Sequence, residues 1–209
     1  MTALEFDRSK LPEEHQHTLS DLLEILSREL PKECSQIQNF DDVLYTTVML
    51  YSHFWDWDYH TIIDKVRDHL KFRVANKVHA LDKFVLPNKS QFQQTTEYYW
   101  HGVDKAGRPV AICRPTDVTP IVRADKADLE KCIMREMEFF LTKRLPEAQK
   151  AHDKPVHQWA LVVDLGQCQF MQALKYKDAF KCLRRIADNY PLMYVFYLPQ
   201  LASKFIKSF

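Results

Sequence analysis

Hydrophobic residues recur with a helical period in the first part of the chain and with mixed periods in the second. Leucines recur at helical spacing over residues 19–30, and Pro31 ends the run. A second helix is expected from about residue 41. A third follows Asp58, a favourable N-cap residue, and carries apolar residues on one face over 62–74. The first ninety residues therefore predict a helical module.

After about residue 90, short apolar runs alternate with amphipathic segments. Four runs predict strands, at residues 98–100, 110–112, 159–165 and 193–198. Between the first two runs, Asp104–Gly107 predicts a hairpin turn in which the glycine takes a positive φ. The other intervening segments predict a long helix that ends near Pro146 and a second helix over 180–186. The alternation predicts an α/β fold, with a helical module at 1–90 followed at 91–209 by a mixed or parallel sheet flanked by helices.

The composition argues against several classes of protein. Of the 209 residues, 46% are hydrophobic and 27% are charged, as in an ordinary globular protein, and the formal net charge is only +1. This charge gives no general attraction to nucleic acid, so no nucleic-acid partner is expected. No stretch approaches the roughly 20 apolar residues of a membrane-spanning helix, and the N-terminus lacks the apolar run of a signal peptide. We therefore expect a cytoplasmic protein.

Candidate catalytic and metal-binding groups are sparse. The three glycines, Gly102, Gly107 and Gly166, are not grouped as in a phosphate-binding loop. The five cysteines are scattered without a C-x-x-C pair, and the histidines lack the cysteine or acidic partners of a zinc site. Asp164 stands at a strand end without a nucleophile and base beside it, which favours a turn or capping role. We expect no enzyme, no metal site and no cofactor.

Four segments together carry a family pattern. They are the hairpin at 100–110 (WHGVDKAGRPV), the strand end at 162–166 (VVDLG), the segment at 188–191 (DNYP) with Pro199 beyond the next strand, and residues 57–58 (WD) with the helix through 70–73 (LKFR). Their order and spacing over about residues 12–209 resemble the CRAL-TRIO family. The resemblance implies a CRAL-TRIO helical module at 1–90 and a CRAL-TRIO lipid-binding domain at 91–209.

The resemblance also implies a function. One face of the sheet would line an apolar pocket for a single hydrophobic lipid, a phospholipid, phosphoinositide or isoprenoid-like molecule, and a movable gate helix would close the pocket. Each CH₂ of a lipid tail costs about 0.8 kcal/mol in water, so a carrier has to bury the tail. The expected role is intracellular lipid transfer or sensing, with a lipid ligand and transient, peripheral contact with a membrane surface.

Six strand residues are candidates for lining this pocket. They are Val110, Ile112, Leu161, Val163, Tyr194 and Phe196. Residues two apart in a strand share a face, so each pair lies on one side of its own strand. The sequence leaves open which side of each strand meets the pocket, and plain core packing is the alternative interpretation.

The C-terminal tail is a candidate gate or membrane contact. Its residues are Leu201, Lys204, Phe205, Lys207 and Phe209. Aromatic and aliphatic side chains would enter the lipid while the lysines meet anionic headgroups. A frayed chain end is the alternative.

The sequence also departs from the family pattern. His53 and Trp55 stand where the family usually has arginines, and the sequence stops within the expected gate helix, before a lysine-bearing strand. We therefore expect a domain that is incomplete at its C-terminus. A second hypothesis follows: a degenerate CRAL-TRIO scaffold acts as a protein-interaction module without a ligand, and a protein partner covers the unfinished C-terminal edge.

Overall fold

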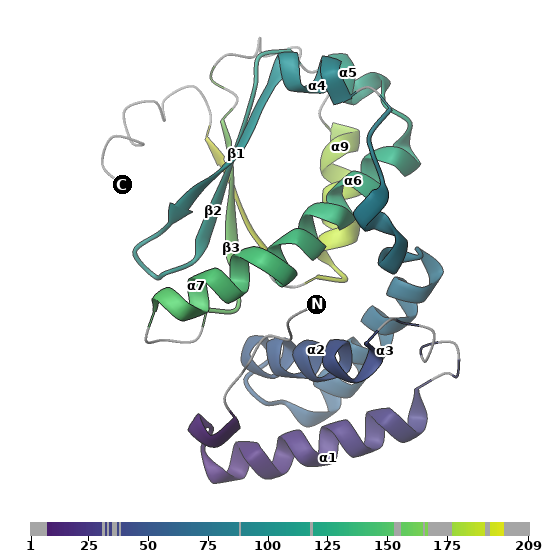
Figure 1. Ribbon diagram of the computed structural model, residues 1–209, viewed down its shortest axis with the longest axis vertical. Helices are drawn as coiled ribbons and strands as arrows, with labels where there is room; N and C mark the ends of the chain where they lie inside the picture. The colour runs from purple at the N-terminus through teal and green to yellow at the C-terminus, as the bar shows by residue number, and fades with distance from the viewer. Residues whose placement is uncertain are drawn as a thin grey trace. The chain divides into compact units, whose positions relative to one another are not determined.

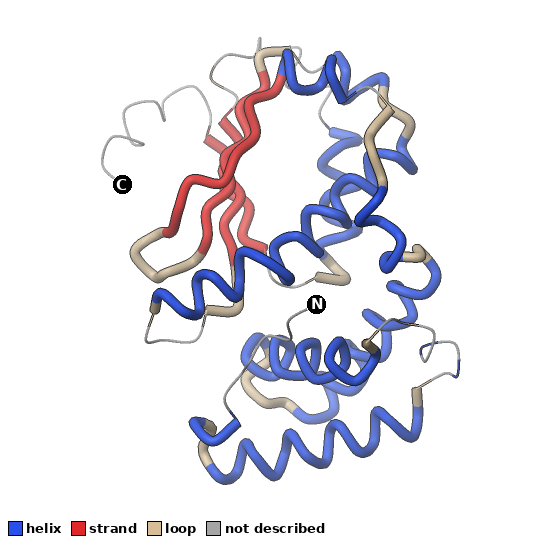
Figure 2. The backbone as a smooth tube through the Cα atoms, in the orientation of Figure 1, coloured by secondary structure: helices blue, strands red, loops and turns tan. Residues whose placement is uncertain are grey.

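The structure is a computed structural model of the chain (Figure 1). It describes residues 8–30, 32, 34, 37, 39–87, 89–117, 119–152, 156–164, 166, 177–190 and 193–198. The chain forms two compact units, one of Met1–Asp82 with Asn189–Leu192 and the other of Lys83–Asp188 with Met193–Phe209. Figure 2 shows that the first unit is helical, whereas the second contains the strands.

Three helices build the first unit. They are α1 (Glu13–Glu29), α2 (Phe40–Phe54) and α3 (Tyr59–Ala75), accompanied by the short helices η1 (Arg8–Lys10) and η3 (Val78–Lys83). The capping role predicted for Asp58 is confirmed, because its carboxylate accepts hydrogen bonds from the backbone N–H of Thr61 at 3.4 Å and from the Thr61 hydroxyl at 2.8 Å. The helical period read from the sequence therefore gives the observed elements.

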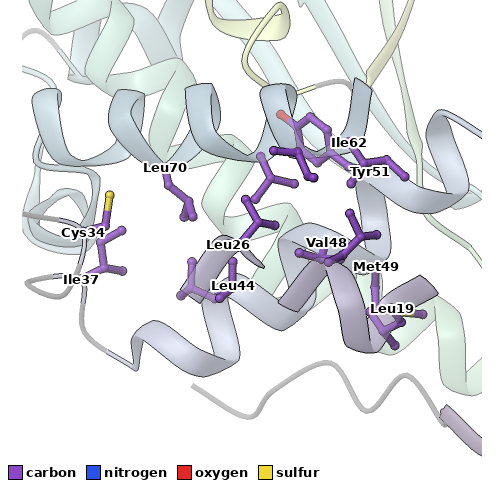
Figure 3. Packing of buried hydrophobic residues seen from close by; sticks show 14 residues of the cluster. Leu19, Leu26, Cys34, Ile37, Leu44, Val48, Met49, Tyr51, Ile62 and Leu70 are labelled. Carbon is purple, nitrogen blue, oxygen red and sulfur yellow. The ribbon is translucent and has the colours of Figure 1, made fainter. Parts of the chain in front are cut away.

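The leucine repeat of α1 forms the centre of the helical unit's core (Figure 3). Leu19, Leu22 and Leu26 are fully buried and pack with apolar residues of α2 and α3. Partners in this core include Leu44, Val48 and Met49 from α2 and Ile62, Val66 and Leu70 from α3. Because all three helices contribute one apolar stripe, each buries a face that it could not bury alone.

A short segment after the last described helix belongs to the helical unit. The backbone carbonyl of Asn189 accepts hydrogen bonds from the Tyr51 hydroxyl at 2.9 Å and from His69 Nδ1 at 2.6 Å. The next residue, Tyr190, is fully buried, with its ring 4.8 Å from that of His69. A carbonyl can only accept, so His69 donates from Nδ1. Burial lowers the pKa of His69 to about 3, which keeps the imidazole neutral near pH 7.

The second unit contains a four-stranded sheet of order β1-β2-β3-β4. The strands are β1 (Thr96–Val103), β2 (Pro109–Pro115), β3 (Trp159–Asp164) and β4 (Met193–Leu198). β1 and β2 are antiparallel, and β2, β3 and β4 are parallel. The predicted mixed sheet is thus confirmed.

The hairpin between β1 and β2 has the predicted turn. Gly107 has a φ of +80°, and a Cβ at this position would lie only 2.9 Å from the His152 ring. The Asp104 carboxylate accepts hydrogen bonds from the backbone N–H groups of Ala106 and Arg108, each at 2.9 Å. Asp104 and Gly107 of this hairpin turn therefore both have a local structural role.

Helices accompany the sheet in the second unit. They are α4 (Lys89–Thr95), α5 (Thr119–Arg123), α6 (Lys126–Phe139), the π-helical turn η4 (Phe140–Arg144), α7 (Leu145–Ala151) and α9 (Lys177–Ala187). Pro146 does not end the long helix, contrary to the prediction, because helical structure continues through η4 to Ala151. Pro146 sits in the first turn of α7, directly after the π-helical turn, so its missing N–H interrupts the hydrogen bonds of the continuous helix without ending it.

Candidate functional site

The strand register divides the sheet into two faces of different character. Trp100 pairs with Ala111, and Ala111 pairs with Leu161, so these three residues point to one side. We call this side the helix face; it comprises Tyr98, Trp100, Ala111, Trp159, Leu161 and Val163. The other side is the open face, and its residues are Glu97, Tyr99, Val110, Ile112, Arg114, Ala160, Val162 and Asp164.

An aromatic cluster closes the helix face. The rings of Trp100 and Trp159 lie 5.0 Å apart, and Phe140 of the π-helical turn stacks on both, at 6.3 Å and 5.7 Å. Trp159 and Phe140 are almost completely buried. The guanidinium of Arg144, one turn further along, lies over the Trp100 ring at 5.7 Å. The π-helical turn therefore brings both residues onto the sheet.

A polar pair lies on the same face. The Tyr98 hydroxyl donates a hydrogen bond to Glu136 Oε2 of α6 at 3.0 Å. Burial raises the pKa of Glu136 above its ordinary value and raises that of the Tyr98 phenol well above its own. Sheet and helix are thus joined on this side by stacked rings and by a hydrogen bond.

The open face is apolar along most of its length. Ile112 and Ala160 are 4% and 3% exposed, and Val110 and Val162 are half-buried. Figure 1 shows α6 and α9 on one side of the sheet, and no helix of the described ranges is drawn across the other. β4 extends the rows, since Tyr194 pairs with Ala160 and Phe196 with Val162. Val110 with Ala160, and Ile112 with Val162, therefore form two apolar rows across β2 and β3.

An ion cluster ends the open face. Arg114 of β2 donates from Nη1 to Glu97 Oε2 of β1 at 2.7 Å and from Nε to Asp164 Oδ2 of β3 at 3.0 Å. The Glu97 side chain is 54% exposed and that of Asp164 only 14%. The hydrogen bond to Asp164 raises the pKa of Arg114, so the guanidinium stays charged. The cluster stands where β2 and β3 reach their carboxyl ends.

The predicted pocket residues do not all share one face. Val110 and Ile112 lie on the open face, and Tyr194 and Phe196 occupy the same rows of the sheet. Leu161 and Val163 lie on the helix face, because they pair with Ala111 and Cys113. The predicted gate residues Leu201, Lys204, Phe205, Lys207 and Phe209 lie outside the described residues.

Several residues of the open face had no role in the sequence interpretation, namely Ala160, Val162, Glu97 and Arg114. Ala160 and Val162 alternate with the chosen Leu161 and Val163, and only the register places them beside Val110 and Ile112. Asp164 does form the predicted turn, with Oδ1 accepting from the Gly166 N–H at 2.9 Å. The sequence held a weak signal for the pairing of Asp164 with Arg114. Arg114 is a single cation at the end of one apolar run, and Asp164 is a single acid at the end of another.

The described residues offer little for other types of site. A cavity of about 120 Å³ lies beside α4 and α6 and is lined in part by Leu86, Phe92 and Asp125, with no cluster of charged residues of both signs among the described residues around it. The described ranges hold no group of three or more metal-ligating side chains. No helix within them is long and apolar enough to cross a membrane. We take the open face as the candidate site because half-buried apolar residues, Val110 and Val162, lead there to the charged residues Arg114 and Asp164.

Comparisons with known proteins agree with the pattern in the sequence. The family model of the CRAL/TRIO domain matches residues 93–209. Protein real-time of Drosophila melanogaster is 26% identical over 182 residues, which are 83% of this chain and 27% of that protein. The phosphatidylinositol/phosphatidylcholine transfer protein SFH9 of Arabidopsis thaliana is 24% identical over 153 residues, 70% of this chain and 26% of that protein.

The chain therefore spans about a quarter of the length of these two relatives. Among solved structures, the crystal structure of Sfh5 matches with a TM-score of 0.48 and 14% identity, over 98% of this chain and 76% of that one.

Proposed function

The chain belongs to the CRAL-TRIO family, and on that premise we propose that it binds a single hydrophobic lipid against the open face, for intracellular lipid transfer or sensing. One of its relatives is named as a phosphatidylinositol/phosphatidylcholine transfer protein, which supports a phospholipid as the ligand. Transient contact with a membrane surface, through the tail residues 201–209, is part of the same proposal.

The observation that carries the proposal is the difference between the two faces. The helix face is closed by Trp100, Phe140 and Trp159, whereas Val110 and Val162 of the open face are only half-buried. An acyl chain of about 16 carbons laid on apolar side chains would gain roughly 13 kcal/mol before the entropic costs of binding, at about 0.8 kcal/mol per CH₂. The open face offers the surface for this contact.

The test is lipid uptake by a pair of matched valine variants. Val162→Asp places a carboxylate in the apolar row, so we expect at least a tenfold loss of bound lipid in native mass spectrometry after incubation with phospholipid vesicles. Val103→Asp, at a 49% exposed position of β1, should retain lipid. Val162→Phe guards against a folding defect, because it stays apolar but fills the row and should also reduce uptake.

The outcome also separates the competing hypothesis. If the folded wild-type chain takes up no lipid from vesicles of several compositions, lipid binding is rejected. The interaction module then gains support if the same chain forms a stable complex with a protein. Equal lipid uptake by the folded Val162 variants and the wild type would reject the open face as the site.

A further inference from the structure

We propose that the ion cluster, formed by Glu97, Arg114 and Asp164, binds the polar end of the bound lipid. Within this cluster, Glu97 selects against anionic headgroups. This inference rests on the proposed function, since it concerns the same open face. Its starting point is a change of polarity along the strands. Val110 and Ile112 of β2 are followed on the same face by Arg114, and Ala160 and Val162 of β3 by Asp164.

The position of the ion cluster suits a headgroup. Ligands of open α/β sheets bind outside the carboxyl ends of the parallel strands. Arg114 and Asp164 stand at those ends of β2 and β3, and Arg114 is 25% exposed. A lipid tail along the apolar rows would thus bring its polar end to this edge of the sheet, where charged groups are already in place.

The hydrogen-bonding state of the ion cluster defines what it can accept. Both oxygens of Asp164 already accept a hydrogen bond, Oδ2 from Arg114 and Oδ1 from the Gly166 N–H, and the side chain is only 14% exposed. Arg114 donates from Nε and Nη1, and within the described residues its Nη2 makes no hydrogen bond. The Glu97 carboxylate accepts a hydrogen bond from Arg114 through Oε2. Its other oxygen, Oε1, belongs to a side chain that is 54% exposed. Over the described part of the chain, the ion cluster therefore has unused N–H donors on Arg114 and an unused acceptor oxygen on Glu97.

The charge balance then sets the preference. Two carboxylates face a single guanidinium, so the ion cluster has a formal charge of −1. A zwitterionic headgroup matches it, with the phosphate near Arg114 Nη2 and the ammonium near Glu97 Oε1. A headgroup of net negative charge would place its excess charge beside the exposed carboxylate, which repels it. Glu97 is accordingly a specificity-determining residue, and it needs no part in holding the tail.

A purely structural role of Glu97 predicts a different result from a role in lipid selection. Cross-strand ion pairs at exposed sites contribute little to stability, so Glu97→Gln should leave the fold intact whichever role is correct. Only selection by charge predicts a change in which lipid is bound. Headgroup preference is therefore the informative measurement.

The experiment offers the full chain vesicles with equal amounts of phosphatidylcholine and phosphatidylglycerol and identifies the bound lipid by native mass spectrometry. We expect the wild type to bind mainly phosphatidylcholine. Glu97→Gln should raise the bound ratio of anionic to zwitterionic lipid about three- to tenfold, which is the size expected for removing one partly screened charge. The matched control is Glu147→Gln, which removes an exposed carboxylate paired with Arg144 at 2.8 Å and should leave the ratio unchanged.

Each contrary outcome has a definite meaning. A wild type that prefers phosphatidylglycerol, or a Glu97→Gln variant that loads lipid with an unaltered ratio, overturns the inference and leaves lipid binding standing. An equal shift in Glu147→Gln also overturns it, because the effect would then come from total charge. If the chain binds an isoprenoid but neither phospholipid, the inference fails and the proposed function survives. If it binds no lipid of any kind, both fail.

Discussion

The two faces of the sheet are made by the same strands but differ in their packing and in their polar groups. On the helix face, Trp100, Phe140 and Trp159 stack, and Tyr98 donates to Glu136, so rings and polar groups meet partners within the protein. On the open face, small and branched apolar residues lead to an ion cluster that keeps a donor and an acceptor at its edge. The comparison teaches that the helix face is packed within the protein, which is why we propose the ligand for the other face.

The largest effect should come from the centre of the helix face. Trp159→Ala removes a side chain that is 2% exposed and leaves a cavity against Phe140, so the free energy of unfolding should fall by about 3–5 kcal/mol. Urea unfolding followed by circular dichroism measures this loss. Trp159→Phe is the control: it keeps an aromatic ring and removes Nε1–H, which has no hydrogen-bond partner, so its cost should be much smaller. A loss below about 1 kcal/mol in Trp159→Ala would contradict a closed helix face.

Neighbouring residues of β3 should respond oppositely in stability and in lipid uptake. Leu161→Ala, on the helix face, should cost about 2–4 kcal/mol of stability and leave the lipid contact unaltered in the folded fraction. Val162→Ala, at a half-buried position of the open face, should cost about 1 kcal/mol but weaken lipid retention. Urea unfolding and lipid retention, measured on both variants, test the division of the sheet. A loss of lipid retention in Leu161→Ala but not in Val162→Ala would contradict this division.

The smallest effect concerns pH and the Tyr98–Glu136 pair. Burial raises the pKa of Glu136 above its ordinary value of 4.5, so the folded chain holds this proton more tightly than the unfolded chain does. The resulting stabilisation is fully present below about pH 4.5 and is lost as the pH rises through the raised pKa. Glu136→Gln cannot titrate, so its stability should decline less between those limits. Thermal unfolding of both proteins across this window measures the difference, and identical pH slopes would show that Glu136 does not sense the burial.

Much of the fold could be predicted because it depends on local patterns. The leucine spacing in α1, the Asp58 cap and the Gly107 turn each follow from a few neighbouring residues, and all three are observed. The continuation of the helix beyond Pro146 could not be predicted in this way. It depends on the π-helical turn, whose Phe140 stacks on two tryptophans that are distant in sequence.

The sequence by itself determined the α/β order of elements, the two residues of each strand that share a side, and the resemblance that the family match then confirmed. Only the tertiary structure decided that Val162 stands beside Ile112, while Leu161 and Val163 face the helices. It also decided that Arg114 joins Glu97 and Asp164 across three strands. The physical reason is the same in both cases. Alternation fixes the two sides within one strand, but the phase between strands is set by hydrogen-bond register, and a shift of one residue would exchange the faces.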